Sequence, residues 1–239
     1  MSTTYSVTRD QIISSALRKL GVLELGATPD TDTVNNGAQV LNLMIKQWMT
    51  DGIKLWTIVE DVLPLVANKN SYTIGPSGDL VADKPLRLIQ AFLRNIQVTP
   101  NVDTPMQIFS KEQYNVLGSK SSTGTPNSVF LDPNTTYSTV YIYLTPDNNV
   151  ATNYQMHLVV QKPIEDILTA TSVPNFPVEW MQALTWGLAD QLALEYGLPV
   201  NHRQEIMTRA ESYKSKLEDW DVENSSTYFT PDTRMRMAR

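Results

Sequence analysis

The chain has 239 residues, of which 41% are hydrophobic and 18% are charged, with a formal net charge of −6 and a pI near 4.9. This length and composition suffice for one large domain or two small ones, while the acidic balance argues against a dedicated DNA-binding protein. Cysteine is absent, which excludes disulfides, thiolate zinc sites and cysteine nucleophiles. The first residues contain no apolar run typical of a secretion signal, so we expect the protein to stay in the cytosol.

Two helices are expected at the start of the chain. Thr8 and Gln11 form a possible capping box for a helix over 8–20, which Gly21 ends. A second helix over 31–51 carries its apolar residues in one arc. Its opposite face is rich in amides, which hints at contact with another polar protein surface, but solvent exposure is the favoured interpretation.

After Gly52 the pattern changes to the alternation of β-strands. Residues 63–66 and 71–74 read as a hairpin, and the loop GPSG at 75–78 is more typical of a turn than of a phosphate site. Further strands are expected over 85–93, 106–109 and 153–161, and residues 128–131 and 139–144 read as a second hairpin. A short helix capped by Ser110 and Gln113 is also expected. On the last strand, His157 is expected to be an ordinary sheet-surface residue.

The helix over 177–196 is apolar nearly all round, which requires other elements to enclose it. Gly187 in its middle indicates that another backbone passes close by. A final helix over 201–220 has a narrow apolar stripe, and we interpret Trp180, Trp186 and Trp220 as packing residues. The charges that interrupt the 177–196 run argue against a membrane span.

These elements predict an α+β protein with a helical body of about four main helices and a β-rich insertion between the two helix pairs. The expected parts are 1–62 and 163–220 for the helical body, 63–162 for the insertion, and 221–239 for an extended tail. The tail has too few apolar residues for a core, so it is expected to order only on a partner.

No catalytic motif is found. The sequence has no GxSxG elbow, P-loop or HExxH motif, and His157 and His202 have no neighbour at metal-ligand spacing. Adjacent carboxylates cannot flank a scissile bond unless the fold brings distant ones together. We therefore predict no catalytic residue, no metal and no cofactor. The candidates for such a carboxylate pair are Glu60, Asp61, Glu165 and Asp166.

Several stretches in order resemble one family. They are SALRKLGVL, LNLMIKQWMTDGIKLW, SYTIGPSGDL with KPLRLIQAF, TPMQIFSKEQY, and VPNFPVEWMQALTWGLADQLALEYG. The set is similar to the head-to-tail adaptors of tailed bacteriophages, also called the packaged-DNA-stabilisation or tail accessory factor family, over most of residues 8–215.

The resemblance implies a structural virion protein, with no enzymatic activity, in the neck of the particle and in the host cytoplasm during assembly. A cell-wall hydrolase carried in the phage particle, using a pair of the four carboxylates named above, remains the alternative. Family members form a ring, generally of twelve copies, beneath the portal protein. They extend the channel through which double-stranded DNA passes and carry the next tail component, which could be a nozzle, stopper or tail hub. In the family the C-terminal segment reaches along the portal, so Tyr228, Phe229, Arg234, Arg236 and Arg239 are the expected portal-binding residues. Arg, Tyr and Met are enriched at protein interfaces. A negative body also suits a DNA conduit, because like charges repel.

Overall fold

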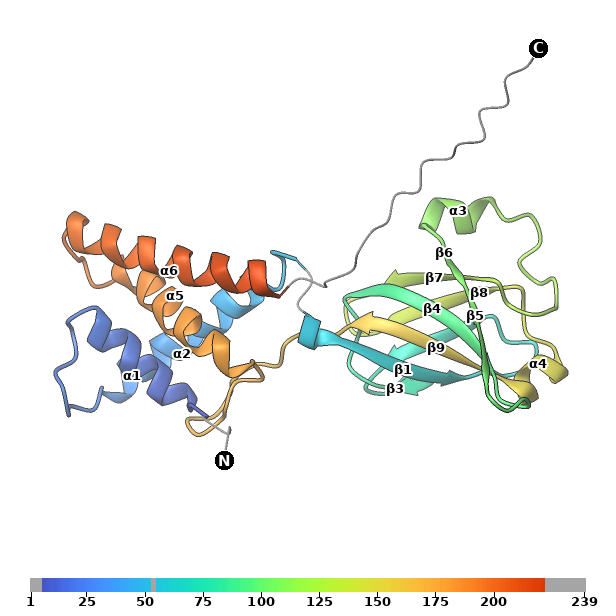
Figure 1. Ribbon diagram of the computed structural model, residues 1–239, viewed down its shortest axis with the longest axis horizontal. Coiled ribbons are helices and arrows are strands. Elements are labelled where there is room, and N and C mark those ends of the chain that lie inside the picture. The colour runs from blue at the N-terminus through green and yellow to red at the C-terminus, as the bar shows by residue number, and fades with distance from the viewer. Residues whose placement is uncertain (1–5, 53–54, 222–239) are drawn as a thin grey trace, which may run out of the picture.

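The computed structural model describes residues 6–52 and 55–221, and Figure 1 shows two bodies side by side along its longest axis. One body is helical and the other consists of strands with two short helices. The chain passes from the helical body to the β body after α2 and returns after β9. We call the narrow crossing between them the waist, formed by residues 55–57 and 162–164.

Four helices build the first body, and their ends follow local signals. Thr8 accepts the Gln11 N–H while the Gln11 side chain accepts the Thr8 N–H, so the expected capping box is confirmed. Asp30 caps the second helix through the Thr33 N–H. The helices are α1 (Arg9–Lys19), α2 (Thr31–Trp48), α5 (Met181–Ala193), which follows a 3-10 turn η2 (Val178–Trp180), and α6 (Val200–Trp220).

Helix α5 lies at the centre of this body, packed against α1, α2 and α6, and nine of its 13 residues are buried. A Cβ atom on Gly187 would lie 2.8 Å from Trp48 Cζ2 and 2.9 Å from Met44 Sδ. The expectation of a close backbone at Gly187 is therefore corrected, because side chains of α2 fill the space that the glycine leaves.

The three tryptophans expected to pack have different environments. Trp180 is fully buried, whereas Trp186 is partly buried beneath the cations of Lys19 and Arg209. Trp220 is 66% exposed, so the packing interpretation is wrong for it. The physical reason is length: α6 has 21 residues against 13 in α5, and its last turn extends beyond the helix that covers its apolar stripe.

The β body is a sandwich of two sheets. The first has the order β1-β9-β4-β5, all antiparallel, from β1 (Ile58–Pro64), β9 (Tyr154–Gln161), β4 (Arg87–Asn95) and β5 (Val102–Pro105). The second has the order β3-β2-β8-β7-β6, from β3 (Leu80–Val81), β2 (Ser71–Gly75), β8 (Ser138–Tyr143), β7 (Ser128–Pro133) and β6 (Gln107–Ile108). The short helices are α3 (Lys111–Val116), with the expected Ser110–Gln113 capping box, and α4 (Asn148–Asn153).

One expected hairpin is confirmed and another is wrong. Strands β7 and β8 pair antiparallel with Ser128 opposite Tyr143. Residues 63–66 and 71–74 do not form a hairpin, because β1 pairs with β9 in one sheet and β2 pairs with β8 in the other. The polar turn between them is a corner that carries the chain across the core from one sheet to the other.

The expected fold class is wrong in its proportions. Within the described residues the protein is a mixed α+β fold with six helices, two sheets and nine strands, 38% helix and 24% strand, and not a four-helix body with a small insertion. The reason is that the inward residues of the two sheets bury one another. Leu63, Ile74, Leu93, Ile142 and Met156 belong to a core of their own, apart from the core around α5. None of the described helices is long and apolar enough to cross a membrane.

Candidate interaction sites

The expected portal-binding residues cannot be placed. Tyr228, Phe229, Arg234, Arg236 and Arg239 all lie outside the described residues. Helix α6, which precedes them, ends beside the waist (Figure 1), where Lys214 forms an ion pair with Asp51, just after α2. The tail therefore starts close to the point where the chain enters β1.

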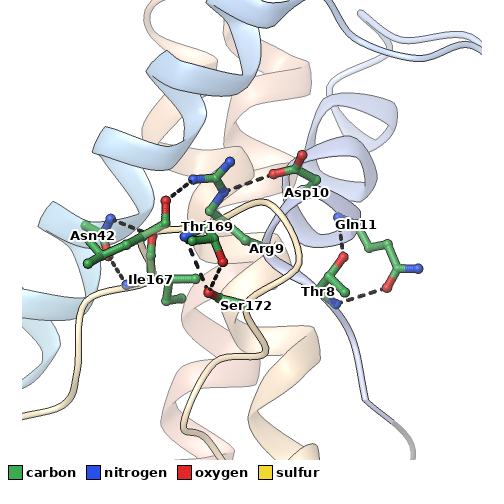
Figure 2. Close-up of polar contacts among 9 residues, drawn as sticks. Thr8, Arg9, Asp10, Gln11, Asn42, Ile167, Thr169 and Ser172 are labelled. Carbon is green, nitrogen blue, oxygen red and sulfur yellow. Dashed lines mark hydrogen bonds and ion pairs between the residues drawn. The ribbon is translucent and has the colours of Figure 1, made fainter.

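The amide-rich face of α2 binds the linker that connects β9 to η2, residues 162–177. Figure 2 shows Asn42 donating to the C=O of Ile167 at 3.3 Å and accepting the Ile167 N–H at 2.9 Å. Further along α2, Lys46 donates to the Ile164 C=O at 3.2 Å and pairs with Asp166 at 2.5 Å. Part of this face is thus covered by residues 164–167, and the expectation that it faces solvent is wrong there.

The start of α1 holds the same linker from its other side. The Arg9 guanidinium donates to the Leu168 C=O at 2.8 Å and pairs with Asp10, while the Arg9 N–H donates to the Ser172 C=O at 2.9 Å. Thr169 and Ser172 close the turn between these contacts (Figure 2). These bonds fix the returning chain to the helical body.

Three of the four candidate carboxylates have a basic partner, and none of the four contacts another across the fold. Glu60 Oε1 lies 2.6 Å from His157 Nδ1, and Asp61 Oδ1 lies 3.1 Å from Lys162 Nζ. Asp166, in the linker, pairs with Lys46 of α2, and Glu165 is exposed. A glycosidase mechanism needs two carboxyl groups facing each other across a bond. No contact among the described residues brings two of these four together.

His157 lies on the outer face of the first sheet but is only 3% exposed, so its interpretation as an ordinary surface residue is wrong. Its ring stacks on Phe92 at 4.9 Å between centroids with the planes 11° apart. The Arg94 guanidinium lies over the Phe92 ring. It also donates two hydrogen bonds, of 2.7 and 2.8 Å, to the Asp103 carboxylate. These hydrogen bonds lower the pKa of the Asp103 carboxyl.

This cross-strand cluster spans β1, β9, β4 and β5, and the sequence carried no signal for it. Glu60 and His157 are 97 positions apart, and only the pairing of β1 with β9 makes them diagonal neighbours. The cluster stabilises the outer face of the sheet. Among the described residues, no group of three or more His, Asp or Glu side chains is arranged to hold a metal ion.

The GPSG loop is a closed turn. The Gly78 N–H donates to the Gly75 C=O, and a Cβ atom on Gly78 would lie 2.5 Å from the Thr73 carbonyl oxygen. Asp79 accepts hydrogen bonds from the Lys69 side chain and from the Thr73 N–H. Both bonds lower the pKa of the Asp79 carboxyl, and the bond from Lys69 has the larger effect. The turn is thus held by an anionic side chain, which opposes phosphate binding.

Exposed apolar side chains lie at both outer ends of the molecule, as they also do elsewhere on its surface, for example at Val116 and Leu168. At the free end of the helical body, the α1–α2 and α5–α6 connections present Leu25, Leu194 and Val200, which are 93%, 63% and 75% exposed. At the far end of the β body, the β4–β5 connection lies beside α4 (Figure 1) and presents Ile96, Val98 and Val102. These exposed side chains make each end a candidate docking surface.

Comparison with known proteins gives no family: no protein-family model matches the chain, and no curated protein matches it significantly.

Proposed function

We propose that this protein is a head-to-tail adaptor of a tailed bacteriophage, a structural component of the virion neck. In this role, copies of the chain form a ring beneath the portal, extend the DNA channel and carry the next tail component. The ordered sequence resemblance over most of residues 8–215 supports the proposal. The family's usual number of copies, twelve, is the expected stoichiometry.

One observation carries the proposal furthest: the molecule is elongated and has exposed apolar side chains at each end. A connector has to bind one partner above and another below, so it needs two separate docking surfaces. Leu194 and Val200 represent the helical end, and Ile96 and Val98 represent the β end. The linker contacts of Asn42 and Arg9 fit the same role, because they hold the returning chain firmly on the helical body.

The test separates the two ends. We would add purified full-length protein to portal rings, follow joining by sedimentation and cryo-electron microscopy, and then add the next tail component. Two matched variants, Leu194→Ser with Val200→Ser and Ile96→Ser with Val98→Ser, each remove exposed apolar side chains at one end and keep the buried cores. We expect one variant to lose portal joining and the other to join normally but fail to accept the next component. If both variants build complete necks, the apolar ends are not docking surfaces and the proposal loses its structural support.

The tail provides a second arm of the experiment. Removing residues 221–239 is expected to abolish portal joining, because Tyr228, Phe229, Arg234, Arg236 and Arg239 are the proposed portal-binding residues. Normal joining by the shortened chain would reject that role of the tail and leave the adaptor proposal to be judged on the two ends.

A further inference from the structure

The first sheet has a free edge at β1, and the hydrogen-bond pattern identifies which residues present it. The Lys162 N–H donates to the Thr57 C=O, which makes 57 and 162 a hydrogen-bonded pair at the start of the β1–β9 ladder. In an antiparallel ladder such pairs alternate. Val59, Asp61 and Leu63 therefore bond to β9. Ile58, Glu60 and Val62 direct their N–H and C=O groups away from β9, where no backbone partner among the described residues meets them.

The sandwich is closed on one side and open on the other. On the closed side, residues 102–108 run from β5 in one sheet directly into β6 in the other, with the Met106 N–H bonded to the Ala91 C=O. On the open side, β1 faces the two-residue strand β3 without pairing to it. A groove of about 440 Å³ lies between these edges, lined by Asp61, Leu80, Val81, Asp83 and Lys162 among others. The open side therefore has unpaired backbone along one wall and apolar side chains along the other.

The residues around this edge specify the chemistry of a strand that could fill it. Val81 in the groove is 74% exposed, so apolar side chains are needed on the groove side of an added strand. Glu60 keeps nearly half of its side chain exposed beside Val62, and Asp83 lies in the groove. Two β1 strands from two copies would bring Glu60 and Asp61 against the same residues, and facing like charges are destabilising. The edge instead fits a basic strand with alternating apolar residues.

We propose that residues 233–239 of the same chain, TRMRMAR, add to the free edge of β1 as a further strand. Met235 and Met237 alternate with Arg234 and Arg236, so one face of such a strand is apolar and the other is cationic. The apolar face covers the groove at Leu80 and Val81, and the cationic face meets Glu60. This inference concerns the free protein and does not rest on the proposed adaptor function.

The tail is long enough to reach this edge. It starts after Asp221, beside the waist from which β1 departs, as the Lys214–Asp51 contact and Figure 1 indicate. Residues 222–239 can extend over roughly 60 Å, whereas the seven residues of β1 span about 23 Å. A tethered segment also meets its site at a high effective concentration, which favours docking within one chain over docking between chains.

Residue-resolved hydrogen exchange of the full-length protein tests the proposal. The amides of Glu60 and Val62 point outward and are protected only by an added strand, while those of Asp61 and Leu63 bond to β9 and serve as internal controls. We expect exchange at Glu60 and Val62 to be slowed about tenfold or more in the parent, at a rate independent of protein concentration. The variant Arg234→Glu, Arg236→Glu, Arg239→Glu should lose this protection, and the matched variant with lysine at the three positions should keep it.

Each outcome decides the question. Rapid exchange of Glu60 and Val62 in the parent protein would overturn the proposal. Protection that persists in the glutamate variant would assign the edge to another occupant. Protection that grows with protein concentration would show docking between chains and overturn the assignment to the same chain. Residues 222–232 are left unchanged in all variants, so the tether is the same throughout.

Discussion

Replacing Trp180 with alanine tests the helical core at its most enclosed aromatic residue. The ring is fully buried and lies 5.0 Å from Trp56, 6.1 Å from Trp48 and 6.3 Å from Phe176 between centroids. Truncation of a buried Trp costs about 3–5 kcal/mol through lost burial and the cavity that remains. Each well-oriented aromatic pair adds about 0.5–1.5 kcal/mol, so we expect the upper end of that range. This loss is a large part of the total stability of a typical domain, about 5–15 kcal/mol.

Denaturant unfolding followed by far-ultraviolet circular dichroism measures the loss without depending on tryptophan fluorescence. Trp220→Ala is the matched control, because the same truncation at a residue 66% exposed should change stability by less than about 0.5 kcal/mol. Hydrogen exchange locates the effect: amides of α5 should lose protection while those of β9 keep theirs, since the two cores are separate. Equal stability of Trp180→Ala and the parent would refute the helical core, and equal losses in α5 and β9 would refute the separation of the cores.

Three further changes test packing, electrostatics and the linker. Gly187→Ala should lower the melting temperature, because overpacking against Trp48 and Met44 costs about 1–3 kcal/mol and exceeds the helix-propensity gain of about 1 kcal/mol; an unchanged or raised melting temperature would contradict this contact. Burial raises the pKa of Asp190, so the folded state binds a proton more readily than the unfolded state and stability falls as pH rises through that pKa. Asp190→Asn should therefore stabilise the protein near pH 7 and have little effect near pH 3, and thermal melts showing the opposite trend would reject the partly buried position of this side chain. Asn42→Ala leaves the Ile167 N–H without its acceptor and should cost about 1–3 kcal/mol, with faster proteolysis of residues 162–177, whereas Asn35→Ala on the exposed part of the same helix serves as the control.

Features that depend on a few consecutive residues could be predicted from the sequence. Capping boxes at Thr8 and Ser110 were predicted because each uses side chains and N–H groups within four consecutive residues. The central position of α5 was predicted from an apolar pattern on all sides, which no exposed helix could tolerate. The strand β4 was predicted over nearly its full length, but a register shift between Leu88 and Gln90 changes which alternate residues point inward. Ala91 and Leu93 are therefore buried together, while Leu88 is only partly buried.

The sequence by itself determined the helices with clear caps, the strands with clear alternation and the break in pattern after Gly52, because each follows from hydrogen bonds and side-chain periodicity within one segment. The tertiary structure alone decided what those segments touch. It paired β1 with β9 and β2 with β8 instead of joining them in a hairpin, and it gave the strands a separate core. It also buried His157 against Glu60 and Phe92, and laid the linker on Asn42. These contacts join residues far apart in the chain, and their free energy depends on how both sheets and all four long helices pack at once, which no local pattern encodes.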